Sequence, residues 1–143
     1  MKIKMLIVFF MLFSASIFSQ DWVLDIEEAK TISEKENKII VLVFQGSDWC
    51  GPCIKLDREI WQTETFKSYA ATHFVMLKAD FPKRKKNALG EAQEKHNNAL
   101  AEKYNKNGYF PYVVVLDSKG KELGALGYKK TTPEAYINLL ESF

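Results

Sequence analysis

The two cysteines of the chain, Cys50 and Cys53, are separated by two residues within Trp49-Cys50-Gly51-Pro52-Cys53. The apolar residues 39–44 before them predict a buried strand, and residues 54–61 after them predict a helix. The first turn of a helix has unpaired N–H groups and a partial positive charge, which both favour a thiolate and can lower a cysteine pKa from about 8.5 to about 3.5–7.5. We therefore expect Cys50 to be the nucleophile of disulfide exchange and Cys53, one helical turn later, to be the resolving thiol.

Other uses of a C-x-x-C pair fit this sequence less well. A structural disulfide across two residues closes a very short loop, so it stabilises less than the roughly 3 kcal/mol expected for a loop of about 15 residues. Zinc needs four ligands, usually in two close pairs, but there is no second C-x-x-C, and His73 and His96 are far apart in the sequence. The c-type haem motif requires a histidine where this chain has Ile54. We expect no metal, and no cofactor other than a Cys50–Cys53 disulfide.

The N-terminal residues predict an export signal. Lys2 and Lys4 precede an apolar stretch at residues 5–13, and small residues follow at Ser14, Ala15, Ser16 and Ser19. The stretch is shorter than the roughly 20 residues of a membrane span, although an uncleaved N-terminal anchor stays open as the alternative. We predict a signal peptide at residues 1–19 and one domain at residues 20–143, exported to the periplasm or secreted.

The charge balance argues against a nucleic-acid partner. The chain has 20 basic and 18 acidic residues, and without Lys2 and Lys4 the two kinds are equal in number. A near-neutral domain has no general basic field to attract nucleic acid. Lys83-Arg84-Lys85-Lys86 is nevertheless a local basic run, for which two interpretations are open: a solvated loop, or a docking patch for an acidic partner.

The hydrophobic pattern predicts an α/β domain. The expected elements, in order, are a helix at 25–37, a strand at 39–44, a helix after Cys53 that Thr63 or Thr65 interrupts or re-caps, a strand at 74–80, a helix at 87–104, a hairpin with strands at 113–116 and 122–127, and a helix from Thr132. Two buried strands joined by a helical crossover are expected to be parallel. The order implies a central mixed β-sheet flanked by helices on both faces.

With these elements in place, the chain resembles the thioredoxin-like superfamily over nearly all of residues 20–143. The sequence Trp49-Cys50-Gly51-Pro52-Cys53 is identical to the thioredoxin active-site motif, and Phe110-Pro111, before a valine-rich strand, stands where the family has its cis-proline. The export signal, the N-terminal helix and the additional residues 80–98 resemble exported bacterial members. The resemblance implies a thioredoxin fold.

The resemblance also implies roles at the motif. Cys50 is the exposed nucleophile and Cys53 the buried resolving thiol. Trp49 shields the sulfur atoms and forms part of the docking surface, while Gly51 and Pro52 support the active site.

A second segment is implied to complete the site. In the family pattern Pro111 is cis and lies against the dithiol, and its backbone neighbours pair with a bound peptide as an added strand. Phe110 and Tyr109 then line the substrate groove. Phe110 is a departure, because the family usually has a small or β-branched residue before this proline.

Two further departures concern charge. Thioredoxins bury an aspartate six positions before the first cysteine to manage the proton of the resolving thiol, and here that position is Phe44. Lys78 and Glu59 are the candidates to take over its role. Asp48, two residues before Cys50, opposes thiolate formation if its charge lies close.

The Gly51-Pro52 dipeptide resembles that of reducing members of the family. We therefore predict a monomeric thiol–disulfide oxidoreductase that reduces protein disulfides in the periplasm and is recharged by a membrane electron donor. Two alternatives stay open: a disulfide oxidase or isomerase, and a non-catalytic thioredoxin-like binding module or metallochaperone.

Overall fold

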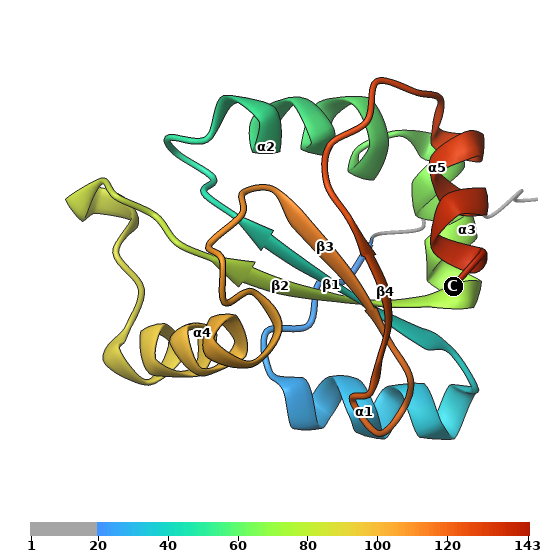
Figure 1. The fold of residues 1–143 in the computed structure, drawn as a ribbon, viewed down its shortest axis with the longest axis horizontal. Coiled ribbons are helices and arrows are strands. Elements are labelled where there is room, and N and C mark those ends of the chain that lie inside the picture. Colours follow the sequence, from blue (N-terminus) through green and yellow to red (C-terminus); the bar gives the residue numbers. More distant parts are fainter. Residues whose placement is uncertain (1–19) are drawn as a thin grey trace, which may run out of the picture.

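The computed structural model describes residues 20–143 (Figure 1), and the predicted signal peptide lies outside the described residues. Within this range the elements are α1 (Ile26–Glu36), β1 (Ile39–Gln45), α2 (Gly51–Leu56), α3 (Glu64–His73), β2 (Phe74–Asp80), α4 (Glu91–Tyr104), β3 (Tyr112–Leu116), β4 (Glu122–Leu126) and α5 (Pro133–Glu141). A π-helical turn, Asp57–Trp61, joins α2 to α3, and a short 3-10 turn, Lys85–Asn87, precedes α4. No helix in residues 20–143 has both the length and the apolar character needed to cross a membrane.

The four strands form one mixed sheet in the order β2-β1-β3-β4. Strand β1 is parallel to β2 and antiparallel to β3, and β3 and β4 form the predicted antiparallel hairpin. Helices α1 and α4 cover one face of the sheet, and α2, α3 and α5 cover the other (Figure 1). The predicted central mixed sheet with helices on both faces is therefore confirmed.

Strand β1 lies in the middle of this core. Its residues from Ile40 to Phe44 are at most 1% exposed. Val41 and Val43 pack toward α2, α3 and α5, whereas Leu42 and Phe44 pack toward α1 and α4. A strand that is buried on both faces has a continuous apolar sequence rather than an alternating one. The segment that contains the two cysteines follows the C-terminal end of β1.

The crossover from β1 to β2 has a break that the sequence indicated. Thr63 caps α3, because its side-chain oxygen accepts the N–H of Phe66 at 3.3 Å. The π-helical turn before it directs Ile60 and Trp61 into the core, where they are 0% and 1% exposed. This packing fixes α2, and with it the position of the cysteines relative to the sheet.

The predicted helix at residues 87–104 begins later than expected, at Glu91. The residues before it bind elsewhere: Asp48 accepts hydrogen bonds from the backbone N–H groups of Lys83 and Arg84 and from the side-chain amide of Asn87. These bonds hold the loop but do not set the start of α4, which lies at Glu91 because Ala88 and Gly90 have non-helical ψ angles of 134° and 153°. The loop is tied by the Asp48 hydrogen bonds to the segment just before Cys50.

Candidate active site

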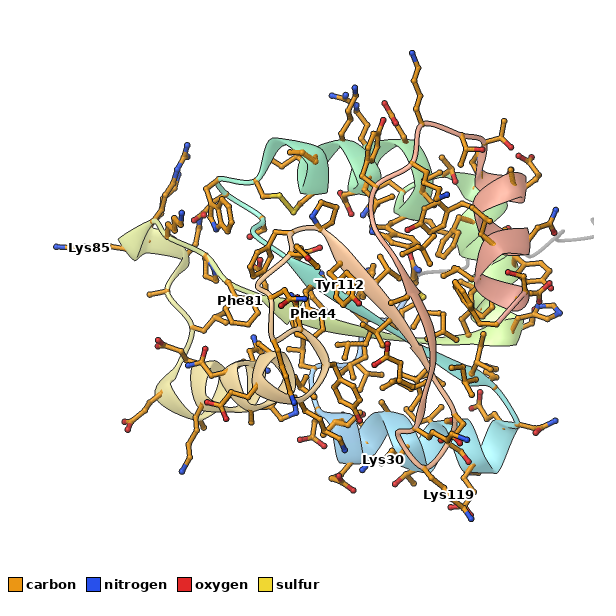
Figure 2. All side chains as sticks on the ribbon, in the orientation of Figure 1. Lys30, Phe44, Phe81, Lys85, Tyr112 and Lys119 are labelled. Carbon is orange, nitrogen blue, oxygen red and sulfur yellow. A yellow bond between two sulfur atoms is a disulfide. The ribbon has the colours of Figure 1, made fainter. Side chains whose placement is uncertain are left out.

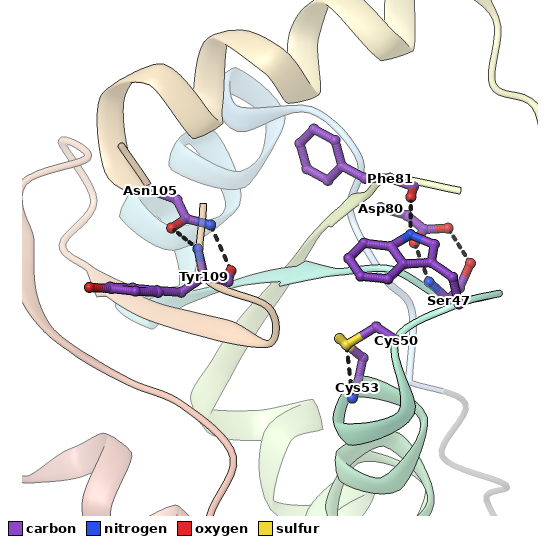
Figure 3. Close-up of a disulfide and its surroundings, with 8 residues drawn as sticks. Ser47, Cys50, Cys53, Asp80, Phe81, Asn105 and Tyr109 are labelled. Atoms are coloured by element: carbon purple, nitrogen blue, oxygen red, sulfur yellow. Dashed lines mark hydrogen bonds between the residues drawn. A yellow bond between two sulfur atoms is a disulfide. The ribbon is translucent and has the colours of Figure 1, made fainter. Parts of the chain in front are cut away.

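Cys50 and Cys53 form a disulfide at the first turn of α2, with their Cα atoms 5.2 Å apart (Figure 3). Cys50 is the N-cap residue, and its Sγ accepts the backbone N–H of Cys53 at 3.3 Å. The carbonyl oxygen of Cys50 accepts the N–H of Ile54 at 3.1 Å, and its own N–H donates to the Gly46 oxygen at 2.9 Å. The sulfur atom of Cys50 thus occupies the place where helix N–H groups stabilise a negative charge.

The prediction that Cys50 is exposed and Cys53 is buried is wrong for the disulfide form, because each residue is 4% exposed. The reason is local: the disulfide holds the Cys50 sulfur against the first turn of α2, where it accepts the Cys53 N–H. Gly51 and Pro52 between them are exposed. A partner therefore approaches the sulfur atoms past this dipeptide, and Pro52 sits in the first turn, where a missing N–H costs no helix hydrogen bond.

Trp49 is partly exposed, at 38%, but it is held in place from three sides. Its indole N–H donates to the carbonyl oxygen of Phe81 at 2.7 Å. Its ring meets the ring of Phe110 edge-on at 5.4 Å, and the Nζ atom of Lys83 lies 3.9 Å from its ring centroid. The structure therefore brings two predicted site residues, Trp49 and Phe110, into contact beside the disulfide.

The Phe110–Pro111 peptide bond is cis, as the resemblance implies. The residues before it are held by Asn105, a 4% exposed residue that the sequence did not single out. The Asn105 side-chain amide donates to the Tyr109 oxygen and its side-chain oxygen accepts the Tyr109 N–H, both at 2.9 Å (Figure 3). Tyr109 itself is 55% exposed, and its ring lies against Tyr112 rather than against Trp49.

Phe44 stands at the sequence position of the family's buried aspartate, but its side chain does not line the pocket beside Cys53. Its side chain lies on the α1 and α4 face, in the cluster with Phe81 and Tyr112 (Figure 2). On the face that carries α2, β1 presents Val43 and Gln45 instead. No carboxylate from this position borders Cys53, because the residue is a phenylalanine and alternation along β1 directs its side chain to the opposite face.

Cys53 instead borders a polar pocket of about 280 Å³, lined by Gln45, Ser47, Cys53, Ile54, Asp57, Gln62 and Lys78. Lys78 lines the same pocket as Cys53, and its Nζ atom lies 4.7 Å from the Trp22 ring centroid. Glu59 is not among the lining residues, since its carboxylate accepts the Tyr128 hydroxyl at 2.7 Å. Asp57 was missed, although its position four residues after Cys53 on a helical segment puts both side chains on one face. Polar groups that could exchange a proton with the Cys53 thiol are thus present in this pocket.

The carboxylate of Asp48 faces the loop rather than standing alone beside the sulfur atoms. It accepts the N–H groups of Lys83 and Arg84 at 2.9 and 3.0 Å and the Asn87 side-chain amide at 2.9 Å. These hydrogen bonds, that of the Lys83 backbone first, lower the pKa of Asp48 to about 2. Asp48 is therefore ionised at any physiological pH, and its charge is shared among the three donors.

The comparisons with known proteins agree with this geometry. Residues 21–118 match the family model described as thioredoxin-like. The chain belongs to the thioredoxin-like family. It is 38% identical over 115 residues to "Disulfide bond reductase DsbH" of Chlamydia pneumoniae, a match that covers 80% of this chain and 68% of that protein. It is 28% identical over 106 residues to "Thioredoxin-related protein DsbJ" of the same organism, covering 74% of this chain but 30% of that protein.

Solved structures lead to the same fold. A structure titled "DsbH Oxidoreductase" superimposes with a TM-score of 0.79 at 35% identity, covering 87% of this chain and 83% of that chain. A thioredoxin from Thermus thermophilus superimposes with a TM-score of 0.62 at 15% identity, covering 87% and 86%, which shows a likeness of fold alone. The predicted thioredoxin fold is therefore confirmed.

In this thioredoxin-like protein, Asp48→Ala is expected to release the 83–87 loop, because it removes the two carboxylate oxygen atoms that accept all three hydrogen bonds. The measurement is amide hydrogen exchange, which should become faster at Lys83 and Arg84. Asp48 has a lowered pKa, so its contribution is complete above about pH 4 and is lost as the pH falls through about 2. Asp21→Ala serves as the control, and unchanged exchange in Asp48→Ala would contradict this anchoring.

Proposed function

We propose that this thiol–disulfide oxidoreductase works as a reductase of protein disulfides in the periplasm. The observation that supports the proposal most is the Cys50–Cys53 pair at the first turn of α2, within a motif identical to that of thioredoxins. The 38% identity to a protein named disulfide bond reductase favours the reducing direction. Export rests on the sequence of residues 1–19.

In the proposed reaction the Cys50 thiolate attacks one sulfur of a substrate disulfide. A Cys50–substrate bond forms and the other substrate sulfur leaves as a thiolate. The Cys53 sulfur, after losing its proton toward the pocket that contains Lys78 and Asp57, then attacks the Cys50 sulfur. This step forms the Cys50–Cys53 disulfide and releases the second substrate thiolate, so two electrons pass from protein to substrate and both thiolates take up protons from water.

The next cycle requires a reductant, because each turnover leaves Cys50 and Cys53 as a disulfide. Exported proteins work among oxidants that preserve disulfides. A membrane protein that supplies electrons through its own dithiol is the proposed donor, with the same exchange run in the opposite direction. The protein is proposed to act as a monomer.

The reduction potential tests the proposed direction. The protein without residues 1–19 is equilibrated in glutathione or dithiothreitol buffers, and its free thiols are trapped and counted. We expect a potential near the roughly −270 mV of thioredoxin. A potential near about −120 mV would contradict a reductase and indicate a disulfide-forming oxidase. Failure to find a reversible dithiol couple would instead indicate a binding module.

A further inference from the structure

Four consecutive cationic residues, Lys83 to Lys86, lie in the loop between β2 and α4, and all four are exposed. Within residues 20–143, no ion pair involves any of these side chains. Figure 2 shows Lys85 reaching outward from the tip of this loop, at the opposite end of the molecule from Lys119. The domain has equal numbers of basic and acidic residues, so this run is a local concentration of positive charge on a neutral background.

The loop is held beside the disulfide by the two residues that directly precede Cys50. Asp48 binds the backbone N–H groups of Lys83 and Arg84. Trp49 donates its indole N–H to the Phe81 oxygen and lies under the Lys83 ammonium group. These contacts fix the base of the loop next to the sulfur atoms while leaving the ends of its charged side chains in solvent.

Asp48 offsets only part of the positive charge of this loop, because its carboxylate interacts electrostatically with Arg84 but, within residues 20–143, forms no ion pair with any of the four cationic side chains. The carboxylate oxygen atoms of Asp48 accept hydrogen bonds from two backbone N–H groups and from the Asn87 side-chain amide. Clusters of one sign of charge near a reaction site raise the rate of encounter with oppositely charged partners by about 10- to 1000-fold at low salt. The cationic ends of Arg84, Lys85 and Lys86 are thus free to meet the carboxylates of a partner.

We propose that residues 83–86 form a docking surface that selects protein substrates with acidic residues flanking their disulfide. This inference rests on the proposed disulfide reduction and names its substrate class. The partner's carboxylates lie over Arg84, Lys85 and Lys86 while its disulfide reaches Cys50 past the exposed Gly51-Pro52 dipeptide. The cationic loop therefore contributes to the encounter and not to the exchange of sulfur bonds.

The test uses three synthetic peptides that contain the same disulfide loop flanked by acidic, neutral or basic residues. The reduced protein is mixed with each peptide in a single turnover, and peptide thiols are followed over time. At low ionic strength we expect the acidic peptide to react at least about tenfold faster than the basic one. This preference should shrink in about 0.5 M salt, where the Debye length falls to a few ångströms.

Two variants with the same change in charge test whether the preference for the acidic peptide comes from this loop. R84Q/K85Q/K86Q leaves Lys83 on Trp49 and is expected to bring the acidic and basic rates to within about twofold. K35Q/K119Q/K121Q makes the same change in charge at the other end of the sheet, beside the start of β1, and is expected to keep the preference.

The outcomes separate the two proposals. Reduction of the neutral peptide by every variant, with no preference for the acidic one in the wild type, would overturn the docking surface and leave the reductase intact. An equal loss of preference in both variants would also overturn it, because net charge would then explain the effect. No reduction of any peptide would overturn the proposed function itself.

Discussion

Cys50→Ser is expected to abolish disulfide reduction, with a fall in rate of at least about a thousandfold. Serine at the first turn of α2 can accept the Cys53 N–H, so the fold is preserved, but its hydroxyl does not form a sulfur–sulfur bond. The measurement is the rate at which a protein disulfide is reduced by the variant supplied with dithiothreitol. A rate near that of the wild type would contradict the role of Cys50.

Cys53→Ser is the matched variant, and it is expected to fail one step later. Cys50 still attacks the substrate, but the mixed disulfide persists because no second thiol is present to resolve it. The conjugate is counted by mass spectrometry under non-reducing conditions. Its accumulation on Cys50 in Cys53→Ser, and its absence in Cys50→Ser, are the expected pair of results. A conjugate formed through Cys53 would reverse the assigned order.

Trp61→Ala is expected to cost about 3–5 kcal/mol of the free energy of unfolding. Trp61 is 1% exposed, and its ring packs edge-on against three aromatic rings at centroid distances of 6.2 Å (Trp22), 4.7 Å (Phe66) and 5.4 Å (Tyr136). Truncation leaves a cavity between the π-helical turn, α3 and α5. Urea unfolding of the oxidised protein measures the loss, with the Cys50–Cys53 bond kept intact in both samples.

Trp49→Ala is the control for this loss. Trp49 is 38% exposed and is held by a single hydrogen bond and by contacts on the surface. We therefore expect it to destabilise the protein less than Trp61→Ala does, while it slows disulfide exchange. A larger loss of stability in Trp49→Ala would contradict the assignment of the core.

Local signals explain why most of the fold was predictable. The unbroken apolar run of β1 indicates a strand buried on both faces, and the structure places it between β2 and β3. Thr132 accepts the N–H of Ala135 and Pro133 stands at the start of α5, as the Thr-Pro pair predicted. The burial of β1 and the start of α5 each depend on a few neighbouring residues, so both features can be predicted from the local sequence.

The parts of the site that were missed depend on contacts between distant segments. Asp48 binds residues 35 to 39 positions further along the chain, and these bonds tie the 83–87 loop to the segment before Cys50. The direction of Phe44 is set by the register of β1 against β2, in which Phe44 pairs with Ala79, and by the turn that follows. Neither the similar burial of the two cysteines nor the role of Asn105 has a local sequence signal.

The most direct test of dithiol–disulfide exchange is the balance of thiols in a single turnover. Fully reduced protein is mixed with an excess of a disulfide-containing protein, the reaction is quenched with an alkylating agent, and both partners are analysed by mass spectrometry. The account predicts that each Cys50–Cys53 disulfide formed is matched by one substrate disulfide opened, with two new substrate thiols. Persistence of reduced Cys50 and Cys53 beside an unchanged substrate would contradict it.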